Sequence, residues 1–184
     1  MAATPGGVLS RNKAEGESPA AADLHPLIAV KLWQNPCWFS FRINYLGLQF
    51  NVPVYGWIEQ RYGLMRPEYV VLYSLGLSDG ISAQDVCASS GFPKNTLSRA
   101  IQKLLRRRLV RRAPDSKDRR RYVLRLTAEG RRIFDETLLP MVEREQRMLA
   151  ALSADEQRTL SKLLARMVEA SPNWPTELVE EEDS

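Results

Sequence analysis

The sequence predicts a mainly helical fold with one small β-hairpin, and the stretch Ile81–Gly130 carries most of that prediction. It contains a helical segment from Ser82 to about Ser90, a turn at Gly91 and a second helical segment with Pro93 in its first turn, followed by a strand, a basic loop and a second strand. A short helix, a tight turn, a longer helix and a hairpin in this order are the elements of a winged helix-turn-helix. Helical periodicity on both sides of the stretch predicts further N- and C-terminal helices.

The two central helices can be assigned from their end residues and their apolar spacing. Ser82 followed by Asp85 predicts a capping box at the start of the first helix. Gly91 predicts the turn, because glycine adopts positive φ at no steric cost, and Pro93 suits the first turn of the next helix. The apolar positions of that helix repeat with helical spacing and predict one buried face: Leu97, Ala100, Ile101, Leu104 and Leu105.

The opposite face of this second helix is polar and basic. In a helix-turn-helix the N-terminal residues of the second helix approach base edges in the major groove. Asn and Gln can read adenine there, and Arg and Lys can read guanine. A solvated amphipathic helix has the same pattern, and the adjacent basic loop favours the DNA interpretation. The expected contacts on this helix are Lys94, Asn95, Thr96, Ser98, Arg99 and Lys103.

The loop Ala113–Arg121 is expected to form the tip of the hairpin. Its Pro-Asp pair favours a turn, and Leu109–Arg112 and Tyr122–Leu126 are expected strands, the second half-buried by alternation. Clustered arginines repel one another unless a polyanion balances them, and a narrow minor groove can accept one. Asp118 is expected to hold the loop in shape by pairing with an arginine, and which arginine points inward is left open. The expected DNA contacts of the loop are Lys117, Arg119, Arg120 and Arg121.

The charge distribution supports a phosphate-binding surface. Residues 91–131 contain 14 lysines or arginines and 3 acids, a net charge of +11, whereas residues 1–90 carry −1 and residues 132–184 carry −6. The net charge of +4 on the whole chain therefore conceals one basic block between acidic flanks. Such a block is typical of proteins that bind nucleic acid.

The sequence resembles the DNA-binding region of the MarR family of transcriptional regulators. The resemblance rests on Asp115–Arg120 in the loop, on the Leu-Thr-x-x-Gly motif that ends at Gly130, and on the preceding helix, and it covers about 38–168. One departure is Arg108, where many relatives have glycine before the first strand. The resemblance implies a homodimer, a palindromic double-stranded operator and a small aromatic carboxylate or phenolic effector. Repression relieved by that effector is the default expectation, and activation is left open.

The N-terminal region is the least typical part of the chain. A short helix is expected to stop near Pro36, and a longer one to follow from Cys37 with a kink or break at Pro53. Several aromatic side chains crowd this region, and a core or dimer-interface role is the alternative to an effector pocket. In the pocket interpretation Arg42 binds a carboxylate while a tryptophan stacks on the ring of the ligand. The candidate ligand-binding residues are His25, Trp33, Trp38, Arg42 and Tyr45.

The C-terminal region predicts two helices. Thr127 should cap a long helix that Pro140 bends, and Ser153 with Glu156 predicts a capping box for the last helix. The last helix has an apolar stripe with no evident intramolecular partner, which favours a dimer interface. These assignments divide the chain into a disordered tail (1–22), N-terminal dimerisation and pocket helices (23–60), the winged helix-turn-helix (61–127), C-terminal dimerisation helices (128–170) and an acidic tail (171–184).

Other function classes are disfavoured by composition. Two cysteines and one histidine provide neither a disulfide framework nor a zinc cluster. No glycine-rich phosphate loop or nucleophile–histidine motif is evident, so the sequence predicts no enzyme and no cofactor. The first residues lack the apolar core of a secretory signal, and a cytoplasmic protein without membrane attachment is expected. Two alternatives stay open: a redox-sensing regulator that uses Cys37, and a nonspecific or architectural nucleic-acid-binding protein.

Overall fold

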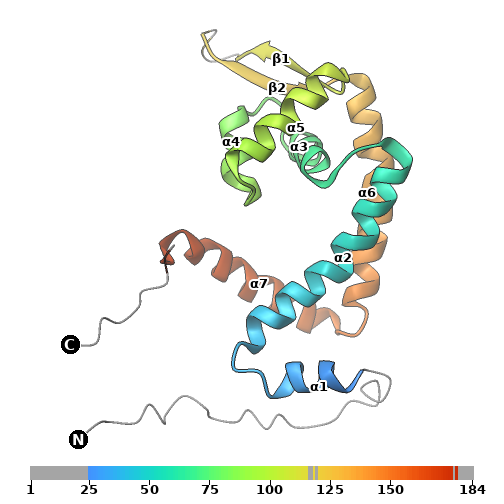
Figure 1. Ribbon diagram of the computed structural model, residues 1–184, viewed down its shortest axis with the longest axis vertical. Helices are drawn as coiled ribbons and strands as arrows, with labels where there is room; N and C mark the ends of the chain where they lie inside the picture. Colours follow the sequence, from blue (N-terminus) through green and yellow to red (C-terminus); the bar gives the residue numbers. More distant parts are fainter. Residues whose placement is uncertain (1–24, 116–117, 119, 176, 178–184) are drawn as a thin grey trace, which may run out of the picture. The chain divides into compact units, whose positions relative to one another are not determined.

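A computed structural model describes residues 25–115, 118, 120–175 and 177. The chain forms two compact units that divide between Thr137 and Leu138, inside one helix. The first unit contains α1 (Pro26–Trp33), α2 (Trp38–Tyr62), α3 (Arg66–Leu77), α4 (Ala83–Ser90), α5 (Lys94–Arg106), β1 (Val110–Pro114), β2 (Tyr122–Leu126) and the start of α6 (Ala128–Leu149). The second contains the rest of α6, α7 (Ala154–Ala170) and a short 3-10 turn, Ser171–Asn173. The predicted fold, mainly helical with an antiparallel hairpin, is confirmed (Figure 1).

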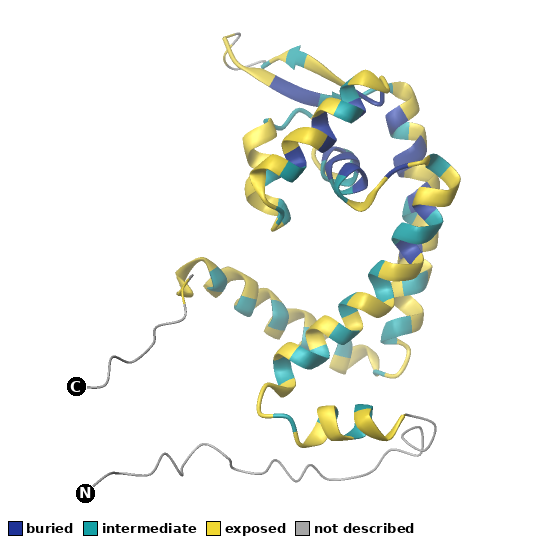
Figure 2. Ribbon diagram, viewed as in Figure 1, coloured by how far each residue is buried: buried dark blue, intermediate teal, exposed yellow. Residues whose placement is uncertain are grey.

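The core of the first unit lies among α3, α4, α5 and the hairpin. α3 contacts α4, α5 and β2, and α5 also contacts α4 and β1 (Figure 1). Figure 2 shows the buried residues concentrated here, on the inward faces of α3 and α5. A fully buried leucine contributes about 1.5–3 kcal/mol, so this cluster fixes the position of α5. Its fully buried members include Tyr69, Leu72, Leu75, Val86, Leu97 and Leu104.

The ends of α4 agree with the sequence prediction. The Ser82 hydroxyl accepts a hydrogen bond from the Asp85 amide (3.1 Å), and the Asp85 carboxylate accepts one from the Ser82 amide (3.2 Å). Gly91 ends the helix with φ of 69°, the left-handed conformation that favours glycine. The predicted capping box and turn are therefore confirmed.

The hairpin differs from the predicted alternation. β1 and β2 pair antiparallel with Val110 opposite Leu126 and Pro114 opposite Tyr122. Val123 and its neighbour Leu124 are both buried, whereas Tyr122 is 66% exposed. The simple half-buried pattern is wrong because both faces of β2 are covered at this point. Leu124 also forms an isolated antiparallel β-bridge with Ile81, which lies just before α4.

The predicted break at Pro53 is absent. α2 runs without interruption through Pro53, and α6 runs without interruption through Pro140. The helix bends expected at these two prolines stay predictions. A proline inside a helix removes one backbone hydrogen bond at a cost of about 3 kcal/mol. In α2 the buried side chains Val54 and Ile58 follow the proline and hold the helix against the core. None of the helices that the structure describes is long and apolar enough to pass through a bilayer.

The second unit is held together at the turn between its helices. Ser153 and Glu156 form the predicted capping box at the start of α7. The Gln157 amide donates hydrogen bonds to the carbonyls of Leu149 (3.1 Å) and Leu152 (2.9 Å), which closes the turn after α6. No residue of α7 is fully buried, and two residues of its apolar stripe, Leu163 and Val168, are more than half exposed.

Candidate nucleic-acid interface

The outer face of α5 is exposed along its first turns. Backbone bonds from Thr96 (2.9 Å) and Leu97 (3.3 Å) to the Pro93 carbonyl start the helix. Thr96 is half-buried, and the other expected contacts of these turns are exposed: Lys94, Asn95, Ser98 and Arg99. Packing of the opposite face therefore fixes the position of this polar surface.

Lys103 lies in a different environment from the other expected contacts. Its Nζ is 2.7 Å from a carboxylate oxygen of Glu68, whose side chain is only 8% exposed. The other carboxylate oxygen of Glu68 accepts a hydrogen bond from the Met65 amide (3.2 Å) at the start of α3. Lys103 therefore fastens α5 to α3, a role that the sequence did not indicate.

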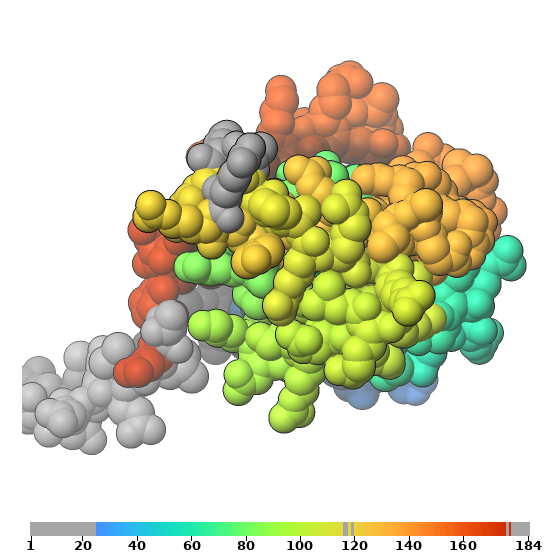
Figure 3. Space-filling model, turned by 90° about the horizontal axis from the view of Figure 1, so that it is seen from above, coloured from blue at the N-terminus to red at the C-terminus, as the bar shows by residue number. Residues whose placement is uncertain are grey.

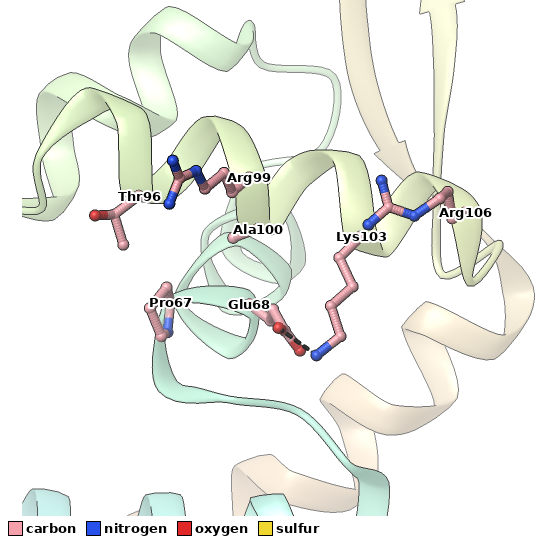
Figure 4. Close-up of a pocket in the computed structure, with 7 residues that line it drawn as sticks. All are labelled: Pro67, Glu68, Thr96, Arg99, Ala100, Lys103 and Arg106. Carbon is pink, nitrogen blue, oxygen red and sulfur yellow. Dashed lines mark ion pairs between the residues drawn. The ribbon is translucent and has the colours of Figure 1, made fainter.

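An open pocket of about 400 Å³ adjoins this ion pair. It lies between the N-terminal end of α3 and α5, and Figure 4 shows its cationic side chains spaced along α5. Glu68 is the one acid of the lining. The lining residues are Pro67, Glu68, Thr96, Arg99, Ala100, Lys103 and Arg106.

The hairpin provides the second part of the basic surface. Arg120 and Arg121 are exposed, whereas Lys117 and Arg119 lie outside the described residues. Asp118 accepts a hydrogen bond from the Arg120 amide (3.0 Å), so it shapes the loop through the backbone. Figure 3 shows side chains of α5 and of the hairpin on one face of the molecule.

The N-terminal end of α4 borders the same surface. Hydrogen bonds from Ser82 hold the pKa of Asp85 below its usual range, and the positive charge of Arg121 adds to this effect. The Asp85 carboxylate therefore stays ionised beside the basic loop.

Two further arginines shape the hairpin and the end of α5, and the sequence indicated such a role for Arg108 but not for Arg125. Arg125 on β2 is 2.5 Å from the Asp79 carboxylate, which ties the hairpin to the loop after α3. Arg108 has φ of 56°. Its amide bonds to the Leu105 carbonyl (3.0 Å), and that of Leu109 bonds to Leu104 (3.0 Å), the pattern of a Schellman end. The absence of the usual glycine was the signal available in the sequence for this conformation.

Arg42 contacts two of the other candidate ligand residues, Trp33 and Trp38. The Arg42 guanidinium donates to the Leu32 carbonyl (2.7 Å) and lies 5.2 Å from the ring centre of Trp33 and 4.8 Å from that of Trp38. His25 caps α1 by accepting from the Leu27 amide (3.2 Å). The half-buried Tyr45 packs on Phe41 of the same helix, with 5.7 Å between ring centres. The structure thus brings Trp33, Trp38 and Arg42 together and leaves the ligand role of these residues a prediction.

The two thiols lie apart in the fold. Cys37 is exposed at the N-cap of α2, and Cys87 is half-buried in α4; both are free.

Comparison with known proteins identifies the family. A model of the MarR family matches residues 62–121, from the end of α2 to the hairpin tip. The transcriptional regulator HosA of Escherichia coli O157:H7 is 30% identical over 112 residues, which cover 61% of this chain and 83% of the relative. The chain belongs to the MarR family of transcriptional regulators. It is therefore a DNA-binding regulator rather than an enzyme, and the architectural and redox alternatives are not favoured.

Solved MarR-type structures agree with this assignment. A MarR regulator from Methanosarcina mazei is 26% identical, with a TM-score of 0.64, and the match covers 74% of this chain and 97% of the other. PcaV of Streptomyces coelicolor, solved with its natural ligand, is 27% identical, with a TM-score of 0.58 and coverage of 76% and 96%. In this MarR-family chain α4 and α5 form the helix-turn-helix, and β1 and β2 form the wing.

Proposed function

We propose that this regulator binds a specific palindromic operator as a homodimer, with α5 in the major groove and the wing arginines on the adjacent backbone or minor groove. The exposed first turns of α5 carry this proposal. Among the described residues no ion pair neutralises Lys94 or Arg99, whereas Lys103 is neutralised by Glu68. Unpaired cations beside Asn95 suit a helix that meets both phosphates and base edges.

The dimer is supported by uncovered apolar side chains in each unit. In α7 Leu163 is 51% and Val168 is 70% exposed, and α2 exposes Ile43, Leu46 and Val52. Burial of these apolar side chains against a second copy of the chain would remove them from water, which favours association. A two-fold dimer would place its two α5 helices on half-sites about 34–36 Å apart.

The test is fluorescence anisotropy with the upstream DNA of the gene and with random duplexes. Arg99→Ala should lower affinity for the preferred site by about 1–3 kcal/mol and relax the preference at one base pair. Arg120→Ala should weaken binding to every sequence and reduce the salt slope by about one. Lys162→Ala is the charge-matched control, since Lys162 is exposed on α7 outside the apolar stripe. Wild-type binding without sequence preference, or sedimentation as a monomer at micromolar concentration, would contradict the proposal.

We also propose that a small aromatic carboxylate or phenolic compound releases the DNA and so relieves repression. PcaV, a relative of similar fold, is solved with its natural ligand. Two half-exposed indoles, Trp33 and Trp38, flank the Arg42 guanidinium in this chain. An aromatic carboxylate would stack on an indole and compete with the Leu32 carbonyl for the guanidinium.

The effector proposal is tested by titrating the DNA complex with a panel of aromatic carboxylates and phenols. A tenfold release requires about 1.4 kcal/mol of coupling. Arg42→Lys keeps the charge and loses the planar fork, so it should abolish the response to the active compound at unchanged DNA affinity. An undiminished response in Arg42→Lys would place the effector elsewhere. A promoter-fusion assay with and without the compound decides between repression and activation.

A further inference from the structure

The C-terminal end of α5 is connected to the C-terminal end of α2 by one side chain. Arg107, the C-cap residue of α5, donates from Nη1 to the Gly63 carbonyl (2.8 Å) and from Nη2 to the Tyr62 carbonyl (2.7 Å). These are the last carbonyls of α2, which have no partner within the helix. A cation at this position also favours the negative end of the helix dipole. The two-pronged contact uses the planar geometry of the guanidinium.

The same end of α2 is connected to α6. The Tyr62 hydroxyl donates to the Glu136 carboxylate (2.8 Å), and Arg132 bonds the other oxygen of that carboxylate (2.5 Å). The Arg61 Nε also donates to the Tyr62 hydroxyl (3.0 Å). The last turn of α2 therefore has side-chain bonds to both α5 and α6.

We propose that Arg107 is a positioning residue that transmits the position of α2 to the recognition helix and does not itself bind phosphate. Arg107 belongs to the run Arg106-Arg107-Arg108, three adjacent cations of the basic block 91–131. The structure separates them, because the guanidinium of Arg107 is occupied by two carbonyls. The amide of Arg107 also closes the last turn of α5 by bonding the Lys103 carbonyl (2.9 Å). A movement of the α2 end thus reaches the backbone of α5 through one residue.

Transmission is first tested in the free protein by amide hydrogen exchange. Tyr62→Phe removes the hydroxyl contacts to Glu136 and Arg61 and alters no residue of α5. We expect it to speed exchange at Gly63 and, several-fold, at Arg108 and Leu109, whose amides bond the last carbonyls of α5. In the Arg107→Lys background the same change should speed exchange at Gly63 only, because lysine keeps the charge but not the fork. Equal effects at Arg108 and Leu109 in both backgrounds, or none in either, would overturn the proposal.

A second test uses DNA and rests on the proposed function. Arg107→Lys should weaken binding to the preferred operator about fivefold, the magnitude of one net hydrogen bond, and should leave binding to random duplex and the salt slope unchanged. Arg106→Lys is the matched control and should change neither affinity. An equal loss on operator and random DNA would make Arg107 a phosphate contact and overturn the proposal, as would wild-type operator affinity. If the wild type shows no operator preference, the proposed function fails and the exchange experiment alone decides the role of Arg107.

Discussion

The close approach between the start of α6 and Leu109, in the connection between α5 and β1, yields a quantitative prediction for Gly130→Ala. A Cβ at Gly130 would lie 2.1 Å from the Leu109 carbonyl oxygen, whereas such contacts essentially never fall below 3.0 Å. The two backbones must therefore separate by about 0.9 Å. That movement strains the bonds that Thr127 donates from its amide to the Leu109 carbonyl (3.0 Å) and from its hydroxyl to the Arg108 carbonyl (2.8 Å).

The expected magnitude follows from three terms. The two hydrogen bonds contribute about 1 kcal/mol each, and forcing an extra methyl group into a packed site costs about 1–3 kcal/mol. Alanine returns about 1 kcal/mol through its higher helix propensity. Gly130→Ala should therefore lower the free energy of unfolding by about 2–4 kcal/mol.

The assay is urea unfolding at fixed protein concentration, followed by circular dichroism. The midpoint should fall while the m-value stays unchanged. Gly56→Ala is the control, because a Cβ there meets nothing within 4 Å, and it should leave stability equal or higher by up to about 1 kcal/mol. A Gly130→Ala protein as stable as the wild type would refute the close approach between Gly130 and Leu109.

Three further outcomes are expected. Lys103→Met should destabilise the fold by about 1–2 kcal/mol, less than the loss of a fully buried ion pair would, because Lys103 is 41% exposed. The same substitution should leave the salt slope of DNA binding unchanged. A slope lower by about one would instead make Lys103 a phosphate contact. Burial raises the pKa of Tyr69 to about 12 from the ordinary 10.0, so stability should fall as the pH rises from 10 to 12. Tyr69→Phe should remove that part of the decline in pH-dependent urea midpoints, and an unchanged decline would contradict it. Arg108→Gly should raise the free energy of unfolding by about 0.5–1 kcal/mol. Glycine adopts the left-handed backbone conformation of this position without steric strain, and this gain exceeds the entropy cost of glycine. An unchanged urea midpoint would mean that the arginine side chain stabilises this turn.

Local signals made the helix-turn-helix predictable. Each of three features depends on residues within a few positions of one another: the capping box at Ser82, the turn at Gly91 and the apolar face of α5. The spacing of these residues in the sequence therefore specifies their geometry. The expectation of a helix break at Pro53 was wrong because it rested on such a local signal alone. A proline disfavours a helix locally, and the burial of Val54 and Ile58 that offsets this effect depends on distant parts of the fold.

The roles of individual cations could not be predicted. The sequence presents Lys103 and Arg107 as members of one basic run, and their partners lie far away in the chain. Arg107 bonds residues 44 and 45 positions earlier, and Lys103 pairs with Glu68 on another helix. Arg42 is similar, since the Leu32 carbonyl lies 10 positions earlier across the turn between α1 and α2. Charge counts locate a DNA-binding surface, but only packing shows which cations remain free for it.

The position of Arg42 beside two indole rings makes intrinsic tryptophan fluorescence a probe of this region. The chain contains 4 tryptophans, and two of them, Trp33 and Trp38, have the same guanidinium within 5.2 Å of their ring centres. Indole emission responds to a nearby positive charge and to the polarity around the ring. A molecule that draws Arg42 away from the rings would shift the emission of both indoles at once. The fluorescence of the unmodified protein can therefore show in solution whether Arg42 remains in contact with Trp33 and Trp38, with no dye attached.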